Sequence, residues 1–302
     1  MLPIKLKLDE SFFEEEVRCG FRVTRERKEI WAVELDLLAE FDRVCRKHNL
    51  HYFADGGTLL GALRHKGFIP WDDDVDVVML REEYDKLLQI APQEFQKPYF
   101  FQCAYTDRGY IRGHSQLRNS ETCGALKKEA HTVSFNQGMF LDIFVLDGVP
   151  EDPKKLEEQM AELRRRKRMM GRVFYIEMCG NPPKYLLKMA RKQLFLHTGM
   201  IHKKYREYEA CARKYGTSED VYLLTFYRQP EEIKRFKKEW YEKTEYLPFE
   251  MLQCPVPSGY QGILEGYYGK DYMTPMQVPN AHGNLIIDTQ RSYREVLKRQ
   301  NR

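Results

Sequence analysis

The chain has 302 residues and a formal net charge of +4, and 42% of its residues are hydrophobic, as in an ordinary globular protein with a substantial core. No stretch approaches the roughly 20 apolar residues needed to cross a bilayer. Seven scattered cysteines, with no Cys-x-x-Cys pair, exclude a disulfide framework and a zinc knuckle and fit a reducing compartment.

The first 60 residues predict a helix, a strand and a glycine turn. The N-terminal residues mix charged and apolar side chains unlike a signal peptide, which favours a cytoplasmic location. Apolar residues recur at helical spacing from Lys28 to Asn49 and predict an amphipathic helix. A short apolar strand at 51–55 then leads to Gly56 and Gly57. Glycines at a helix start let the backbone approach an anion, so this turn is a candidate phosphate site.

The next feature is acidic, with four aspartates among residues 72–76. Carboxylates this close repel one another unless cations neutralise them. The β-branched and apolar residues among 74–80 predict a strand, on which alternate residues share a face, so Asp74 and Asp76 would project together. Such oxygen ligands suit Mg²⁺ or Mn²⁺. A solvated acidic loop is the alternative, whereas a calcium loop is disfavoured because Val77 stands at its glycine position.

Together these motifs resemble a known signature. Gly-Gly-Thr at 56–58, Arg64-His65 and the run GFIPWDDDVD at 67–76 closely resemble the signature of the LicD family of phosphotransferases, to which the fukutin-related proteins belong. The resemblance covers residues 30–150 strongly. It implies an α+β fold, with a nucleotidyltransferase-like mixed sheet flanked by helices and an appended, mainly helical C-terminal part.

The resemblance also implies roles for the residues of this signature. Those that would hold the phosphate oxygens or supply compensating charge and hydrogen bonds are Gly56, Gly57, Thr58, Arg64 and His65. Trp71 either packs in the core or holds a quaternary ammonium group by cation–π attraction.

The chain continues with a helix at 81–91 and two strands, at 99–105 and 111–118, that read as a hairpin. His114, Gln116 and Arg118 lie on one alternating face of the second strand. A LicD-like fold would place this face near the metal, so Arg118 is a candidate substrate contact. A solvated strand face is the alternative interpretation.

After a predicted loop at 120–137, the apolar strand at 139–146 carries a single carboxylate, Asp142. A lone Asp in such a run is costly unless it is paired or bound to a metal. LicD-like families place a third carboxylate on a neighbouring strand, so the resemblance implies that Asp142 joins Asp74 and Asp76. These three are the candidate catalytic residues and the candidate ligands of Mg²⁺ or Mn²⁺, with Asp142 as general base.

We place a boundary near residue 150, between a nucleotidyltransferase-like catalytic core (1–150) and a mainly helical part with a C-terminal substrate-pocket element (151–302). The later elements predicted are helices at 152–172 and 184–215, a strand at 222–227, a helix at 231–242 and a charged helix from 288. Residues 255–282 loosely resemble the C-terminal LicD element, although Lys270 is inserted in its usual Gly-Asp step. His282 matches a position where the family often has histidine, with a surface histidine as the alternative.

The second half is strongly basic in part, because residues 153–215 contain 17 Lys and Arg against 6 Asp and Glu. The run Arg164–Arg168 lacks interleaved aromatic residues, so we interpret it as a solvated helix face and expect no nucleic acid. The apolar stripe of the helix at 184–215 packs against the core. Our hypothesis is that this helix also rests on the anionic inner face of the membrane.

The resemblance implies transfer of a phospho-alcohol group, phosphocholine above all, from a CDP-activated donor to a hydroxyl of a cell-surface glycan or its lipid-linked precursor. Ribitol phosphate is a related group that such enzymes use. Two alternatives stay open: a nucleoside-triphosphate-dependent nucleotidyltransferase acting on a small acceptor, and a non-catalytic, metal-binding scaffold for glycan assembly.

Overall fold

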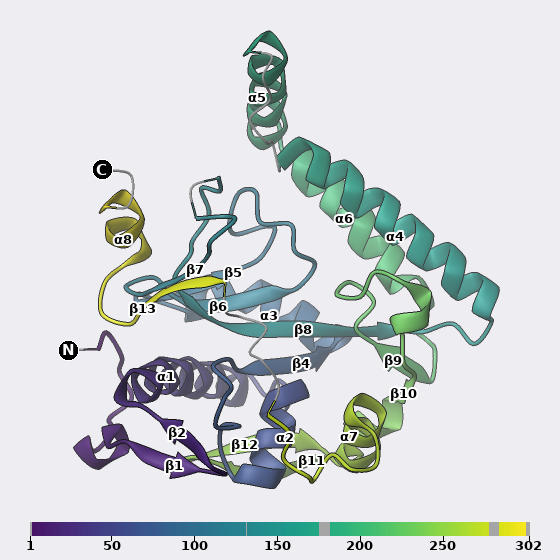
Figure 1. Cartoon of the computed structure of the whole chain (residues 1–302). Helices are drawn as coiled ribbons and strands as arrows, with labels where there is room; N and C mark the ends of the chain where they lie inside the picture. The colour runs from purple at the N-terminus through teal and green to yellow at the C-terminus, as the bar shows by residue number, and fades with distance from the viewer. Residues whose placement is uncertain (1, 131, 175–181, 278–283, 300–302) are drawn as a thin grey trace.

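The computed structural model describes residues 2–130, 132–174, 182–277 and 284–299 and shows a curled mixed sheet flanked by helices (Figure 1). The strands of this sheet, in spatial order, are β10 (Phe236–Lys237), β9 (Asp220–Tyr222), β8 (Met139–Gly148), β4 (Asp76–Leu80) and β3 (Phe53–Ala54), with β6 (Ser115–Asn119) also pairing with β8 and β5 (Tyr99–Gln102) with β6. This architecture confirms the predicted α+β class.

The long strand β8 organises the sheet. It pairs in parallel with β4, and it pairs antiparallel with β6 at its start and with β9 at its end. All ten of its residues except Phe140 and Asp142 are buried, which explains its apolar sequence. The predicted hairpin is also present, because β5 pairs antiparallel with β6.

Eight helices lie among the described residues. They are α1 (Arg25–Lys47), α2 (Gly56–His65), α3 (Arg81–Glu94), α4 (Pro153–Phe174), α5 (Pro182–His197), α6 (Met200–Ala212), α7 (Tyr260–Tyr268) and α8 (Tyr293–Arg299). Helix α1 confirms the amphipathic helix predicted near its position. The side chain of its N-cap residue, Thr24, accepts a hydrogen bond from the Arg27 N–H.

Three small two-stranded sheets complete the fold. They are β1 (Glu16–Arg18) with β2 (Phe21–Val23), β11 (Thr244–Phe249) with β12 (Leu252–Pro257), and β7 (Cys123–Leu126) with β13 (Leu285–Asp288). The segment 120–137, predicted as a loop, therefore contains a strand. Its partner lies about 160 residues further along the chain, which local sequence patterns do not reveal.

Two predicted helices were wrong. The segment 231–242 forms 3₁₀ turns at Pro230–Glu232 and Lys238–Tyr241 around strand β10, because Phe236 packs its ring against Tyr222 instead of continuing a helical face. The helix predicted over 184–215 is two helices, because Gly199 adopts a left-handed φ of 67° between α5 and α6.

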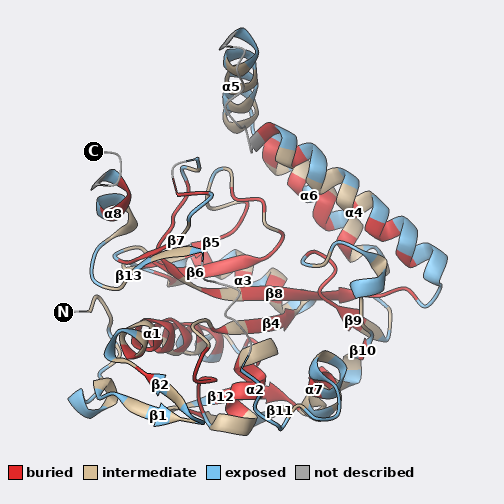
Figure 2. Cartoon of the chain, in the orientation of Figure 1, coloured by how far each residue is buried: buried red, intermediate tan, exposed pale blue. Residues whose placement is uncertain are grey.

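The core runs through both halves of the chain (Figure 2). One buried cluster contains apolar side chains of β4 and β8, such as Ile143, together with side chains of α4, α6 and β9, such as Tyr222. Strands β9 and β10 also extend the sheet beyond residue 150. The division into two domains at that residue stays a prediction. Among the described residues, no helix is both long and apolar enough to span a membrane.

A buried ion pair fixes α3 to the sheet and leads to the first prediction. Arg81 donates to both carboxylate oxygens of Asp147, at 2.8 and 2.7 Å, and the Asp147 side chain is 1% exposed. Arg81→Met would leave this buried carboxylate unpaired, so we expect unfolding to become easier by about 3–5 kcal/mol. Urea denaturation measures this change. The matched control, Arg46→Met, removes an exposed ion pair with Asp42 and should lower stability by less than about 1 kcal/mol.

The basic run on α4 is not uniformly solvated, which gives a pH-dependent prediction. Lys167 donates to the carbonyl oxygens of Arg112 and Thr225, at 2.8 and 3.1 Å. Burial lowers the pKa of Lys167 to about 8, and the positive charges of Arg228 and Arg112 add to this effect.

Between pH 8 and the unperturbed lysine pKa of about 10.4, the unfolded chain therefore holds more protons than the folded chain, so stability rises with pH. We expect wild-type protein to gain stability from pH 7.5 to 9.5 relative to Lys167→Met, as measured by thermal melting. Parallel melting curves for the two proteins would contradict the assignment.

Candidate active site

Two of the predicted acidic residues lie on neighbouring strands. Asp76 is the first residue of β4, and its register partner on the parallel strand β8 is Asp142. Asp74 precedes β4 in a turn, so the prediction that it shares a strand with Asp76 was wrong. The structure therefore places Asp76 and Asp142 side by side, with Asp74 arriving from the adjoining turn.

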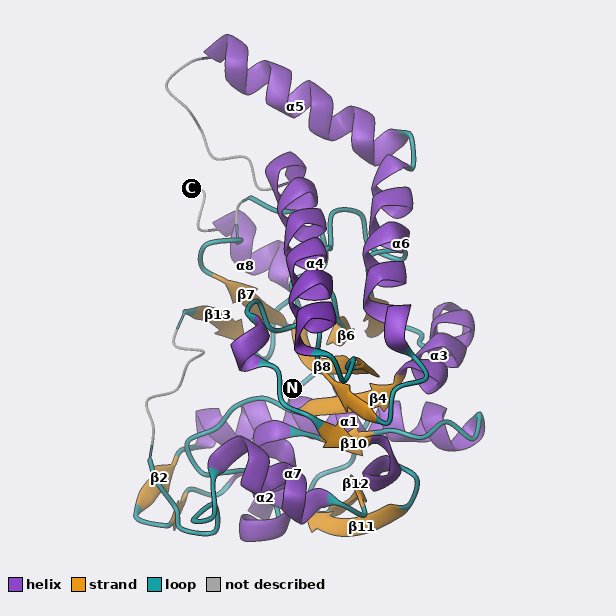
Figure 3. Cartoon of the chain, turned by 90° about the vertical axis from the view of Figure 1, so that its right-hand side faces the viewer, coloured by secondary structure: helices purple, strands orange, loops and turns teal. Residues whose placement is uncertain are grey.

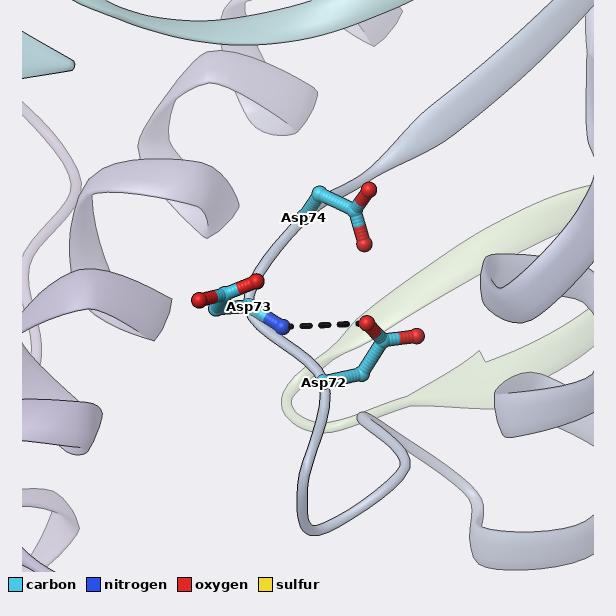
Figure 4. Close-up of side chains that lie close together, drawn as sticks. All are labelled: Asp72, Asp73 and Asp74. Carbon is cyan, nitrogen blue, oxygen red and sulfur yellow. Dashed lines mark hydrogen bonds between the residues drawn. The ribbon is translucent and has the colours of Figure 1, made fainter. Parts of the chain in front are cut away.

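This turn consists of three consecutive acidic residues, Asp72 to Asp74. Among the residues that the structure describes, these three are the only set of three or more acidic, His or Cys groups whose ligand atoms lie within 4.8 Å of one another. Asp74, Asp76 and Asp142 do not meet this spacing as a set. Figure 4 shows Asp72 and Asp74 extending to one side of the turn and Asp73 to the other.

Helix α1 supports the turn through backbone contacts. The carbonyl oxygen of Asp72 accepts hydrogen bonds from Arg27 Nη1 and Trp31 Nε1, both at 2.9 Å. The Asp73 N–H donates to Asp72 Oδ1 at 3.2 Å (Figure 4). These bonds fix the backbone from which the carboxylates project.

The electrostatics around Asp76 fit a divalent cation. Burial raises the pKa of Asp76 well above its usual range, and the negative charges of Asp74, Asp142, Asp55 and Asp72 raise it further. The folded protein therefore brings together carboxylates that disfavour each other's ionised form. A bound Mg²⁺ or Mn²⁺ would relieve this repulsion, and carboxylate oxygens are the ligands both ions prefer. Their role as metal ligands stays a prediction.

Asp142 has a different environment from Asp76. Gln116 Nε2 donates to Asp142 Oδ1 at 2.7 Å, and His114 Nε2 lies 3.2 Å from the same oxygen. Burial raises the pKa of Asp142, but the neighbouring His114 and the hydrogen bond from Gln116 outweigh it and lower the pKa overall. Asp142 is therefore held in one orientation and favoured as the carboxylate.

Arg118 is buried, which rules out the solvated strand face, and a substrate contact by this residue stays a prediction. Its side chain is 1% exposed, and its guanidinium donates to Gln102 Oε1, Gln116 Oε1 and the Gly138 carbonyl oxygen. It also packs over the ring of Phe140. Arg118 therefore orients Gln116, which in turn holds Asp142.

The predicted phosphate cradle adjoins the acidic residues. Gly56 has a φ of 51°, and a Cβ there would lie 3.6 Å from Asp76 Oδ2. A Cβ at Gly57 would lie 2.6 Å from Asp72 Oδ2, so a side chain there would displace the Asp72 carboxylate. Both glycines begin α2, whose free N–H groups favour an anion. The hydroxyl of Thr58 accepts a hydrogen bond from the Asp76 N–H at 2.8 Å, so it contacts the protein backbone.

Arg64 and His65 contact other protein groups. Arg64 Nη1 donates to the carbonyl oxygens of Tyr272 and Thr274, and its Nε donates to His65 Nε2 at 2.9 Å. Burial lowers the pKa of His65 to about 4, with the positive charge of Arg64 adding to the effect, so this imidazole is neutral at pH 7. Arg64 thus ties α2 to the C-terminal tail, and a phosphate contact by either residue stays a prediction.

Trp71 is 9% exposed and packs edge-on against the rings of Phe21 and His65. Of its two predicted roles, the structure matches packing in the core. His282, the remaining candidate, lies outside the described residues.

Two further acids at the site were not predicted. Glu34 on α1 is 3% exposed, and burial together with the charges of Asp74 and Asp73 raises its pKa well above the usual range. Asp55 immediately precedes α2 and accepts a hydrogen bond from Tyr267 Oη at 3.2 Å. The sequence could have indicated Glu34, because it lies on the apolar face of a predicted helix, where an acid is unusual.

The parallel pair of β4 and β8, with adjacent carboxylates beside a helix that begins at glycines, is characteristic of a nucleotidyltransferase-like domain. A family model described as "LicD/FKTN/FKRP, nucleotidyltransferase domain" matches residues 49–145. The chain is also 31% identical over 262 residues to the lipopolysaccharide cholinephosphotransferase LicD of Haemophilus influenzae, covering 79% of this chain and 88% of that protein. The chain therefore belongs to the LicD family, and the resemblance of its signature is confirmed.

Shorter stretches of the chain are similar to uncharacterized proteins. One from Rickettsia prowazekii is 43% identical over 63 residues, which is 21% of this chain and 24% of that protein. One from Caenorhabditis elegans is 47% identical over 47 residues, which is 16% of this chain and 12% of that protein.

Proposed function

We propose that the protein transfers phosphocholine from CDP-choline to a hydroxyl of a cell-surface glycan or of its lipid-linked precursor, and releases CMP. Membership of the LicD family and the name of the Haemophilus relative support this class of reaction. The observation that carries the proposal is the pairing of Asp76 with Asp142 beside the glycines that begin α2. Because such precursors are built on the inner membrane face, the proposal places the protein in the cytoplasm.

The residues at the site can divide the reaction between them. When bound by Asp74, Asp76 and Asp142, Mg²⁺ or Mn²⁺ would neutralise the diphosphate and stabilise the leaving CMP. The N–H groups of Gly56 and Gly57, at the start of α2, would bind phosphate oxygens.

Asp142 is the candidate base. As the acceptor hydroxyl oxygen bonds to the choline phosphorus, the P–O bond to CMP breaks and the hydroxyl proton passes to this carboxylate. Its contacts with Gln116 and His114 support the oriented carboxylate that a base requires.

The experiment that tests the proposal follows the leaving group. Purified protein with Mg²⁺ and a lipopolysaccharide acceptor should release CMP from CDP-choline, and EDTA should stop the release. If the protein released CMP from CDP-ribitol and not from CDP-choline, the transferred group would be ribitol phosphate. Pyrophosphate release from nucleoside triphosphates would instead establish the nucleotidyltransferase alternative. A glycan-binding protein that is inert with every donor would be a scaffold.

A further inference from the structure

We propose that Phe226, Tyr227 and Tyr268, here called the aromatic rim, bind a quaternary ammonium group and so select choline over a neutral alcohol. This inference rests on the proposed function and assigns one part of the donor to side chains that the LicD signature does not contain. The rim comes from the segment after β9 and from α7, both in the second half of the chain.

The rim is part of a continuous set of aromatic contacts. Phe226 packs edge-on against Tyr227, with ring centroids 5.2 Å apart, and against Phe144, at 5.0 Å. On the other side, Tyr227 stacks on Tyr222 at 5.1 Å. Contacts of Tyr222 with Tyr267, and of Tyr267 with Tyr268, continue the set. The rings therefore form a row in which each packs against its neighbours.

The aromatic set runs along the acidic residues. At one end, the ring of His114 lies 4.9 Å from that of Phe144, and its Nε2 lies 3.2 Å from Asp142 Oδ1. At the other end, Tyr268 Oη would lie 3.9 Å from a Cβ at Gly56. Between them, burial raises the pKa of Tyr227, and the negative charges of Asp55 and Asp76 add to this shift.

Two members of the rim are open to a ligand. Phe226 is 46% exposed and Tyr268 is 44% exposed, whereas Trp71, the aromatic residue of the LicD signature, is 9% exposed. Exposed aromatic faces attract quaternary ammonium ions through their negative quadrupole. A neutral polyol gains nothing comparable from a phenyl ring. The rim therefore fits choline better than ribitol.

The test compares ligands that differ only in the alcohol. Calorimetry would measure dissociation constants for CDP, CDP-choline and CDP-ribitol with Mg²⁺ present. We expect Phe226→Leu to weaken CDP-choline binding by about tenfold and to leave CDP and CDP-ribitol binding unchanged. Phe226→Trp should restore binding because it restores an aromatic face. Tyr246→Leu, at a 51% exposed position on β11, is the matched control.

The outcomes separate the two proposals. If Phe226→Leu changes CDP and CDP-choline binding equally, or changes neither, the aromatic rim does not select choline while the proposed reaction can still stand. If wild-type protein binds none of the CDP ligands, both the rim and the proposed function fall.

A second inference rests on an independent observation, the exposed face of α5. This helix lies across the ends of α4 and α6, away from the sheet (Figure 3). Leu186, Leu187 and Leu194 are 66%, 72% and 56% exposed. At helical spacing these three leucines share one side, while Phe195 and Leu196 pack against the core cluster. We infer that the leucine face docks on an anionic lipid surface.

Charge supports lipid as the partner. Residues 182–206 contain seven Lys and Arg and no Asp or Glu. By helical spacing, Lys184 and Arg191 lie next to the leucine side of the helix. From there their charged ends reach the lipid head groups while the leucines enter the acyl boundary. An amphipathic helix with this charge is attracted to anionic membrane surfaces.

Vesicle flotation tests this inference. Wild-type protein should float with vesicles containing phosphatidylglycerol and much less with phosphatidylcholine alone. Leu187→Gln combined with Leu194→Gln should reduce flotation by about tenfold, whereas Val17→Gln, at a 71% exposed position on β1, should not. Equal flotation of all variants would overturn the inference. So would a wild-type dimer that the leucine substitutions dissociate, because it would assign the face to a second copy of the chain.

Discussion

Asp76→Asn is expected to reduce choline phosphate transfer by at least about 10³-fold and, in metal-free buffer, to raise the melting temperature. Burial and four neighbouring carboxylates raise the pKa of Asp76 well above its usual range. In the unfolded chain Asp76 ionises freely at neutral pH, whereas in the folded chain it must either carry its charge at an unfavourable site or take up a proton, and the neutral amide removes this cost. Activity and stability should change in opposite directions.

Thermal melting with and without Mg²⁺ measures the second part of this prediction. Added Mg²⁺ should stabilise wild-type protein more than Asp76→Asn, because the wild-type site carries the repulsion that the ion relieves. Glu245→Gln, at an exposed position on β11, controls for a general loss of negative charge. An Asp76→Asn protein that melts at a lower temperature and still transfers phosphocholine would refute the assignment.

Arg118→Met is expected to lower the free energy of unfolding by about 3 kcal/mol or more and to reduce kcat. The substitution leaves Gln102, Gln116 and the Gly138 carbonyl without their donor, and each unpaired buried acceptor costs about 1–3 kcal/mol. Gln116 would then lose the partner that orients it toward Asp142.

Urea denaturation and steady-state kinetics test the two parts separately. Because Arg118 acts through Gln116, KM for CDP-choline should change less than kcat. Arg165→Met is the matched control, because Arg165 is exposed and pairs with Glu162 on the same helix. A large rise in KM with kcat unchanged would return Arg118 to its predicted role as a substrate contact.

Local patterns predicted the elements that carry the site. The apolar strand around Asp142 and the helix that starts near the two glycines each depend on neighbouring residues, and both are present. That the strand of Asp142 lies beside that of Asp76 followed from the family resemblance, whereas the register that pairs the two residues is seen only in the structure. The exact start of β4 was missed, because an alternating pattern does not show where hydrogen bonding begins.

What the sequence could not show depends on contacts between distant segments. Arg118 alternates correctly for an exposed strand face, yet residues around Gly138 cover it. Strand β7 exists because β13 pairs with it, and the aromatic rim arises because α7 and the segment after β9 meet beside α2. Such arrangements are set by tertiary packing, which overrides local propensity.

The most direct test of the proposed metal site is anomalous diffraction from crystals soaked with Mn²⁺ and CDP-choline. Our account predicts a Mn²⁺ peak at about 2.1 Å from carboxylate oxygens of Asp74, Asp76 or Asp142, with the diphosphate at the start of α2. A donor bound without any Mn²⁺ at these carboxylates, or with Mn²⁺ only at a distant surface, would contradict it.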